Sequence, residues 1–283
     1  MSIKKVGVIG AGTMGNGIAQ ACAVAGIDVV MLDIKDEAVQ RGLATIAGSL
    51  DRLIKKEKMT PAEKDAAMAR IKGTTQQADF AACDLVVEAA TENVDLKLRL
   101  LKEVEAHLKA DAILASNTSS ISITRLAAAV RHSDRFIGMH FFNPVPVMAL
   151  VEVIRGLQTT DATHDTVVAL AKALGKTPIS VRNSPGFAVN RILCPMINEA
   201  IFALSEGLAT AEDIDNGMKL GCNHPIGPLA LADMVGLDTL LAVMDVFYTQ
   251  FNDSKYRPAP LLREMVDAGY LGRKTGRGFY SYA

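Results

Sequence analysis

One stretch of the chain places an ionisable side chain among apolar ones. Residues 139–148 read MHFFNPVPVM, in which His140 is the one ionisable residue, and Glu152 follows in the run MALVEVI. An imidazole can take up and return a proton near neutral pH, and a carboxylate commonly holds its second ring nitrogen. If the chain turns back in antiparallel fashion around Pro146, His140 lies opposite Glu152. The spacing therefore predicts a proton-transfer pair, and the alternative is a core histidine satisfied by one hydrogen bond.

A glycine motif near the N-terminus predicts a dinucleotide site. Gly10, Gly12 and Gly15 form GAGTMG between the apolar run KVGVIG and a helical pattern. In a strand–turn–helix of this kind, the glycines allow a tight turn, close approach of backbone to a pyrophosphate and close helix packing. Asp33 ends the next apolar run, where a carboxylate would accept the ribose 2′-OH and repel a 2′-phosphate. The motif favours NAD over NADP; the alternative is an ordinary glycine-rich turn with a solvated Asp33.

The first part of the chain alternates short β-branched runs with helical patterns. This alternation is typical of an α/β fold, here a Rossmann-type, doubly wound, mostly parallel sheet with helices on both faces. A helix is expected at 36–57, where apolar residues recur at helical spacing. The predicted strands are 5–10, 28–33, 84–89, 112–117, 135–142, 148–154 and 178–183.

The pattern changes at Ser184-Pro185-Gly186, after which only helices are expected. We predict a dinucleotide-binding domain over 1–184 and an all-helical domain over 185–283. The predicted helices of the second domain are 187–207, 211–221, 229–250 and 260–268. Their apolar arcs are wide, which favours a homodimer formed through this domain. A tightly packed monomeric bundle is the alternative.

Composition excludes several classes of function. The net charge is −1 and Trp is absent, which argues against nucleic-acid binding. No run of about 18 apolar residues would span a membrane, and the N-terminal apolar stretch is too short for a targeting signal. Four cysteines without paired spacing predict a reducing, cytoplasmic setting. No metal site is expected, because the remaining histidines lack a ligand constellation; they are His107, His132, His164 and His224.

Several longer motifs, taken together, resemble one enzyme family over nearly the whole chain. They are GAGTMGNGIAQ, DLVVEAATEN, ASNTSSISI, HFFNPVPVMALVEV, SPGFAVNR, DIDNGMKLGCNHPIGPLALAD and GRKTGRGFY. The chain resembles the short-chain-type L-3-hydroxyacyl-CoA dehydrogenases, and most closely the stand-alone bacterial enzymes that act on 3-hydroxybutyryl-CoA. The stretches around residues 140 and 190 are the most specific part of this resemblance.

The resemblance implies a role for individual residues. His140 becomes the catalytic base and Glu152 its partner, while Ser119 and Asn190 hold the carbonyl region of the substrate. Coenzyme A contacts fall at Ser49 and Lys56. Cofactor positions, besides the glycine motif and Asp33, fall at Glu92, Lys97, Ser119, Asn143 and Lys274.

Simpler roles are available for most of these residues. Ser119 could be the N-cap of the helix that follows it, as could Ser120 or Ser122. Ser49 and Lys56 share one face of the predicted 36–57 helix, and this face could simply be solvated. Asn190 could face solvent. Glu92 and Asn143 could be caps or turn residues, and Lys274 could be a solvated charge in a glycine-rich tail.

The expected function is NAD-dependent oxidation of an (S)-3-hydroxyacyl-CoA, with reduction of acetoacetyl-CoA in the reverse direction. The active site is expected between the two domains. β-Oxidation, butyrate formation and polyester precursor synthesis are all compatible with it. Two other functions stay open: a β-hydroxyacid dehydrogenase acting on a free acid, which typically uses a lysine, and a non-catalytic NAD-binding structural protein.

Overall fold

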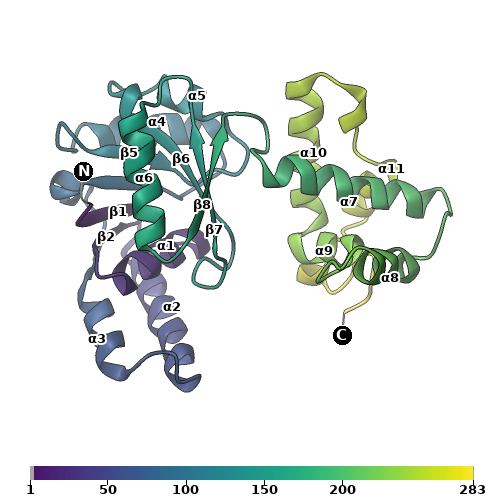
Figure 1. Ribbon diagram of the computed structural model, residues 1–283, viewed down its shortest axis with the longest axis horizontal. Coiled ribbons are helices and arrows are strands. Elements are labelled where there is room, and N and C mark those ends of the chain that lie inside the picture. The colour runs from purple at the N-terminus through teal and green to yellow at the C-terminus, as the bar shows by residue number, and fades with distance from the viewer. Residues whose placement is uncertain (1–2, 283) are drawn as a thin grey trace. The chain divides into compact units, whose positions relative to one another are not determined.

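The structure, a computed structural model that describes residues 3–282, divides into two compact units at Asn183 and Ser184. The sequence places the boundary at 184, where the alternation of strands and helices stops. Each unit has its own apolar core, and each is described by itself below (Figure 1).

The first unit is built on one eight-stranded sheet in the order β3-β2-β1-β4-β5-β6-β7-β8. All adjacent strands are parallel except β6 and β7, which are antiparallel. The strands are β1 Lys5–Ile9, β2 Asp28–Leu32, β3 Ile71–Thr74, β4 Leu85–Glu88, β5 Ile113–Ser116, β6 Phe136–Phe141, β7 Leu150–Arg155 and β8 Thr177–Arg182. The predicted doubly wound, mostly parallel sheet is confirmed.

Sequence analysis missed strand β3. Its sequence, IKGT, is short and only partly buried, because it lies at the edge of the sheet. An edge strand carries little of the apolar pattern by which buried parallel strands are recognised. The missed strand extends the sheet beyond β2 without changing the elements that carry the candidate site.

Helices connect the strands of this unit and cover the sheet (Figure 1). The α-helices are α1 Thr13–Val24, α2 Asp36–Lys55, α3 Pro61–Ala69, α4 Val94–Glu105, α5 Ile123–Ala127 and α6 Asp161–Ala173. The 3₁₀ segments are η1 Gln77–Ala82 and η2 Ser133–Arg135. Helix α2 ends two residues before the end predicted at 57, so Lys56 is its C-cap residue.

The second unit consists of helices around their own core. They are α7 Val189–Ser205, α8 Ala211–Gly221, α9 Pro228–Val235, α10 Leu237–Phe251 and α11 Pro260–Asp267, with 3₁₀ segments η3 Ser254–Tyr256 and η4 Arg273–Thr275. The single helix predicted at 229–250 is wrong. Gly236 divides it into α9 and α10. Its φ is +101°, a backbone conformation that residues with a side chain rarely adopt.

Two buried carboxylates hold the C-terminal tail of this unit in place. Asp233 accepts hydrogen bonds from the backbone N–H groups of Phe279 and Tyr280, at 2.9 Å and 3.0 Å. Asp215 accepts one from the Tyr280 hydroxyl at 2.8 Å. Gly278 of the GRKTGRGFY motif is needed for this packing, because a Cβ there would lie 1.9 Å from Asp233 Oδ1.

Within residues 3–282, no helix is long and apolar enough to cross a bilayer, and no group of three or more acidic, His or Cys side chains could hold a metal ion. The four cysteines of the chain are free thiols. Burial raises the pKa of Cys22 and of Cys194 to about 12, so both stay protonated and pack as small apolar residues.

Candidate active site

Four buried polar side chains lie on one face of the sheet, near the carboxyl ends of its central strands. Side chains alternate between the faces of a strand, and residues paired across strands point to the same face. Glu88 pairs with Ser116, and Ser116 pairs with Gly138, two residues before His140. His140 in turn pairs with Glu152. Parallel sheets of this type bind ligands at this edge, so the arrangement marks a site.

His140 and Glu152 form a direct, buried pair. His140 lies on β6 and Glu152 opposite it on β7, and Nδ1 of the imidazole is 2.7 Å from Oε2 of the carboxylate. Their exposed fractions are 6% and 0%. A carboxylate can only accept, so Nδ1–H donates to it and the ring orientation is fixed. The register predicted from an antiparallel return at Pro146 is confirmed.

The loop between the two strands is tied down from several sides. Lys176 Nζ donates to the carbonyl oxygens of Val145 and Met148 at 2.6 Å and 2.9 Å. Gly17 of helix α1 packs against the same loop, since a Cβ there would lie 2.8 Å from Val145 Cβ. These contacts fix the turn, and with it the distance between His140 and Glu152. Asn143, which begins the loop, is exposed.

The glycine loop has the geometry that its sequence predicts. Gly10 has a φ of +98°, and a Cβ on it would collide with the backbone of Ala89. A Cβ on Gly15 would lie 1.8 Å from the carbonyl oxygen of Gly10. Helix α1 can therefore pack this close to the loop only with glycine at position 15. Gly12 is exposed with open space beside it, at the N-terminus of α1, where no side chain caps the backbone N–H groups. A pyrophosphate fits there.

Asp33 stands beside this loop, directly after β2. Its Oδ2 accepts from the backbone N–H of Ala11 at 2.8 Å, and its Oδ1 accepts from Ile34 N–H. The side chain is partly exposed. The carboxylate thus orders the glycine loop, and the residue stays accessible to a ligand. The residues present fit a dinucleotide with a free 2′-OH.

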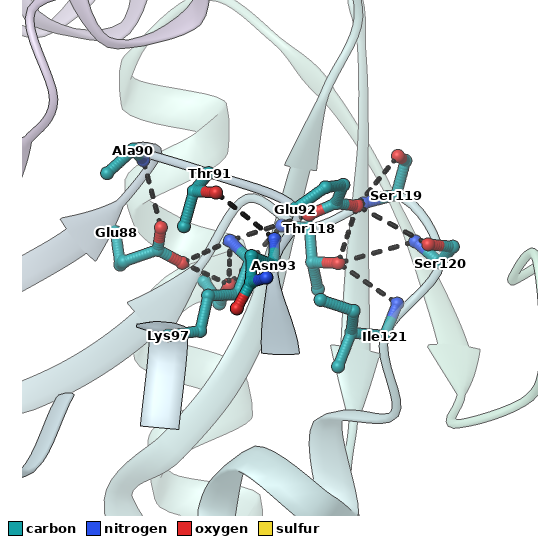
Figure 2. A network of polar contacts seen from close by, with 11 residues as sticks. Glu88, Ala90, Thr91, Glu92, Asn93, Lys97, Thr118, Ser119, Ser120 and Ile121 are labelled. Carbon is teal, nitrogen blue, oxygen red and sulfur yellow. Dashed lines mark hydrogen bonds and ion pairs between the residues drawn. The ribbon is translucent and has the colours of Figure 1, made fainter. Parts of the chain in front are cut away.

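Ser119 and Glu92 lie together in the loops after β4 and β5. Glu92 Oε1 accepts from the Ser119 backbone N–H at 2.7 Å and from its hydroxyl at 3.0 Å, as Figure 2 shows. Ser122 is the N-cap of α5, accepting from the Arg125 N–H. Ser119 is therefore not the N-cap, and the residue is partly exposed in the loop after β5.

Two lysines assigned to the cofactor by resemblance have protein partners in the structure. Lys97 is 1% exposed, and its ammonium lies 2.5 Å from Glu88 Oε2. Lys274 is half-exposed and bonds both carboxylate oxygens of Asp238, at 2.5 Å and 2.6 Å. The Lys97 ammonium is thus enclosed by the protein, whereas a direct contact with a ligand requires an accessible group.

The remaining predicted residues lie outside this cluster. Ser49 is partly buried on α2, and Lys56 is exposed as the C-cap residue of that helix. Asn190 is partly exposed at the start of α7, in the second unit.

Sequence reasoning missed two members of the buried cluster, Glu88 and Ser116. Both end strands that are otherwise apolar, LVVE and ILAS. A charged residue in a strand buried on both faces needs a partner, and this signal could have pointed to Glu88.

The chain is similar to known proteins over nearly its whole length. The family model for the NAD binding domain of 3-hydroxyacyl-CoA dehydrogenase matches residues 5–184, and the model for its C-terminal domain matches residues 186–282. A 3-hydroxybutyryl-CoA dehydrogenase of Bradyrhizobium diazoefficiens is 54% identical, over 99% of this chain and 96% of its own length. One of Clostridioides difficile is 49% identical over 98% and 99%.

Among solved structures, the (S)-3-hydroxybutyryl-CoA dehydrogenase of Ralstonia eutropha matches with a TM-score of 0.98 and 70% identity over the full length of both chains. The similarity to this structure therefore covers both units of the chain. The chain belongs to the 3-hydroxyacyl-CoA dehydrogenase family.

Proposed function

We propose that this protein oxidises an (S)-3-hydroxyacyl-CoA with NAD and catalyses the reverse reduction, with 3-hydroxybutyryl-CoA and acetoacetyl-CoA as its substrate pair. The observation that carries the proposal is the 2.7 Å contact between His140 and Glu152 at the ligand edge of an NAD-binding sheet. Relatives named 3-hydroxybutyryl-CoA dehydrogenase share about half or more of the sequence over their full length, which supports this substrate.

His140 performs the proton step. In oxidation, the hydroxyl proton on C3 passes to the imidazole while the C3–H bond breaks and the carbonyl forms. Bound NAD supplies the acceptor for the hydride in oxidation and its donor in reduction. Glu152 holds the Nδ1 proton, so the second ring nitrogen is the one that exchanges a proton with substrate, and its charge stabilises the imidazolium.

The other site residues position the two ligands. Ser119 is proposed to hydrogen-bond the C3 oxygen, with Asn190 of the second unit as a further contact to the substrate. The glycine loop and Asp33 are proposed to hold the pyrophosphate and the adenosine ribose. Further cofactor contacts are proposed for Glu92, Asn143 and Lys274, and coenzyme A contacts for Ser49 and Lys56. For Lys97, burial favours an indirect contribution.

We further propose a homodimer formed through the helical domain. The domain is assigned 185–283 and the dinucleotide-binding domain 1–184. The support comes from exposed apolar side chains of the second unit, which a partner subunit could cover. They include Leu208, Leu220, Met234 and Val235. The four cysteines are free thiols, one of them exposed, which supports a location in the reducing cytoplasm.

The substrate class is tested by comparing NADH oxidation with acetoacetyl-CoA against free acetoacetate. We expect kcat/KM for the thioester to exceed that for the free acid by at least about 10²-fold, because remote contacts to coenzyme A contribute to binding in the transition state. A protein that prefers acetoacetate would be a β-hydroxyacid dehydrogenase instead. Absence of turnover with both, alongside NADH binding, would indicate the structural role.

Replacing Glu152 tests the pair. Glu152→Gln keeps size and a hydrogen-bonding group but removes the charge opposite His140. We expect kcat for acetoacetyl-CoA reduction to fall about 10²-fold or more, within the span of a general acid–base residue. Unchanged kcat, with NADH affinity retained, would leave His140 as a core histidine.

Cofactor choice is tested at Asp33. The wild type should use NADH in preference to NADPH, and Asp33→Ala should narrow the ratio of the two kcat/KM values by about tenfold or more, since it removes both the 2′-OH acceptor and the repulsion of a 2′-phosphate. Asp36→Ala, at the exposed start of α2, is the control. Equal use of NADH and NADPH by the wild type would contradict the assignment.

The coenzyme A contact is tested at Lys56. Lys56→Ala should raise KM for acetoacetyl-CoA several-fold, about the effect of one exposed charge on a phosphate, and leave the Kd of NADH unchanged. Lys55→Ala is the matched control, because Lys55 is the adjacent residue at the same helix end and is also exposed. A loss of NADH affinity in Lys56→Ala would place this helix end on the cofactor side.

A further inference from the structure

One buried carboxylate lies next to the site without a part in the proton step. Glu88 is the last residue of β4 and is 0% exposed. Its Oε2 accepts from Lys97 Nζ at 2.5 Å and from Ser116 Oγ at 2.8 Å. Its Oε1 accepts from the backbone N–H of Ala90 at 2.9 Å. Both carboxylate oxygens accept hydrogen bonds from the protein, so any influence of Glu88 on a ligand passes through these neighbouring residues.

Lys97 connects this carboxylate to a second one nearer the surface. Its Nζ lies 2.5 Å from Glu88 Oε2 and 3.5 Å from Glu92 Oε2. The Lys97 side chain is 2% exposed, whereas that of Glu92 is 45% exposed. One buried cation therefore lies between an enclosed carboxylate and one that solvent or a ligand can reach (Figure 2).

The other oxygen of Glu92 holds the turn that carries Ser119. Glu92 Oε1 accepts from the Thr118 hydroxyl at 2.8 Å and from the Ser119 backbone N–H at 2.7 Å. Thr118 Oγ1 accepts in turn from the backbone N–H of Ile121 at 3.0 Å. Polar contacts thus run without interruption from Glu88 through Lys97 and Glu92 to Ser119, as the side chains in Figure 2 show.

Stability alone is a weak reason for the buried pair. Taking two charges out of water costs free energy that their attraction offsets only in part, and apolar residues of equal volume often serve as well. The pair lies at the carboxyl ends of two parallel strands, where ligands bind, and it contacts a partly exposed carboxylate. A role toward the ligand explains its location.

We infer that Glu88 is a positioning residue for the ligand site. It fixes Lys97, Lys97 fixes Glu92, and Glu92 sets the Ser119 turn while offering its exposed carboxylate to a hydrogen-bond donor of NAD. The inference rests on the proposed function, because Ser119 and Glu92 are assigned to substrate and cofactor there. It also explains how Lys97 can matter for the cofactor while its ammonium is enclosed.

The first test replaces Glu88 by Gln, which keeps the size of the side chain and one acceptor oxygen, for the Ala90 N–H, but removes the negative charge next to Lys97. Lys97 then retains Glu92 as its nearest carboxylate, and drawing Glu92 inward should release the Ser119 turn. We expect kcat/KM for acetoacetyl-CoA to fall about 10–100-fold, a typical cost of misplacing a contact by about 1 Å, and the Kd of NADH by fluorescence titration to rise. The melting temperature should also fall.

Asp84→Asn is the matched control, because Asp84 directly precedes the same strand, at the end opposite to Glu88. Asp84 Oδ1 is 2.5 Å from Lys109 Nζ, and its Oδ2 accepts from the backbone N–H of Lys4 and Lys5. This variant should lower the melting temperature while kcat and the Kd of NADH stay within about two-fold of wild type. Glu88→Gln values that match those of Asp84→Asn would overturn the inference.

A charge-neutral double variant separates positioning from core packing. Glu88→Gln/Lys97→Met removes both buried charges, so the melting temperature should recover relative to Glu88→Gln. The weakened NADH binding should persist, because the ammonium that contacts Glu92 Oε2 is then absent. Recovery of both the melting temperature and the Kd of NADH would show that the pair only fills the core.

Glu92→Gln supplies a variant that leaves the buried pair intact. If the three residues act in series, Glu88→Gln combined with Glu92→Gln should lose no more NADH affinity than the more damaging single variant. Losses that multiply would mean independent roles and would overturn the inference. NADH binding is measured without any acyl substrate, so failure of the proposed substrate would leave these readouts intact.

Discussion

The proton chemistry of the site depends on one hydrogen bond, the 2.7 Å contact between His140 Nδ1 and Glu152 Oε2. It joins adjacent strands β6 and β7, the one antiparallel pair among the neighbouring strands of the described sheet. In an antiparallel pair, two side chains lie directly opposite each other on one face, and a short hairpin is enough to connect the strands. Parallel neighbours need a long crossover connection instead. The reversal of direction after β6 therefore has a chemical consequence, because it brings a carboxylate to the imidazole within a single hairpin.

The buried charges of the first unit gather on the same face of the sheet and near the same ends of its strands. Glu88 and Glu152 are each 0% exposed, and each has a cationic or protonatable partner, Lys97 or His140. In such surroundings an unpaired charge is costly, so each pair constrains the side chains beside it. The apolar residues on the opposite face form a core of their own. Buried apolar residues, among them Val86, Leu114 and Phe136, also surround the charged pairs on the site face.

Much of this arrangement follows from local sequence. The glycine motif between a strand and a helix predicts Gly10, Gly12 and Gly15 in their observed places, and NPVP between two apolar runs predicts that His140 faces Glu152. What escaped prediction depends on contacts between distant segments. Strand β3 is weakly patterned because it is an edge strand, and the break at Gly236 depends on tertiary packing, since α9 and α10 read as one apolar helix. The burial of Lys97 follows from Glu88, nine residues earlier, and Ser116, nineteen later.

The most direct test of the central claim is the tautomer of His140, read from its ring ¹⁵N signals by NMR in the free enzyme. The signals are assigned by their loss in a His140→Asn variant. We predict that in the neutral ring the proton resides on Nδ1, bound to Glu152, and that its ¹H signal lies far downfield as in a charge-assisted hydrogen bond. A neutral ring that carries its proton on Nε2 would contradict the account, because Glu152 would then not hold the imidazole for proton transfer.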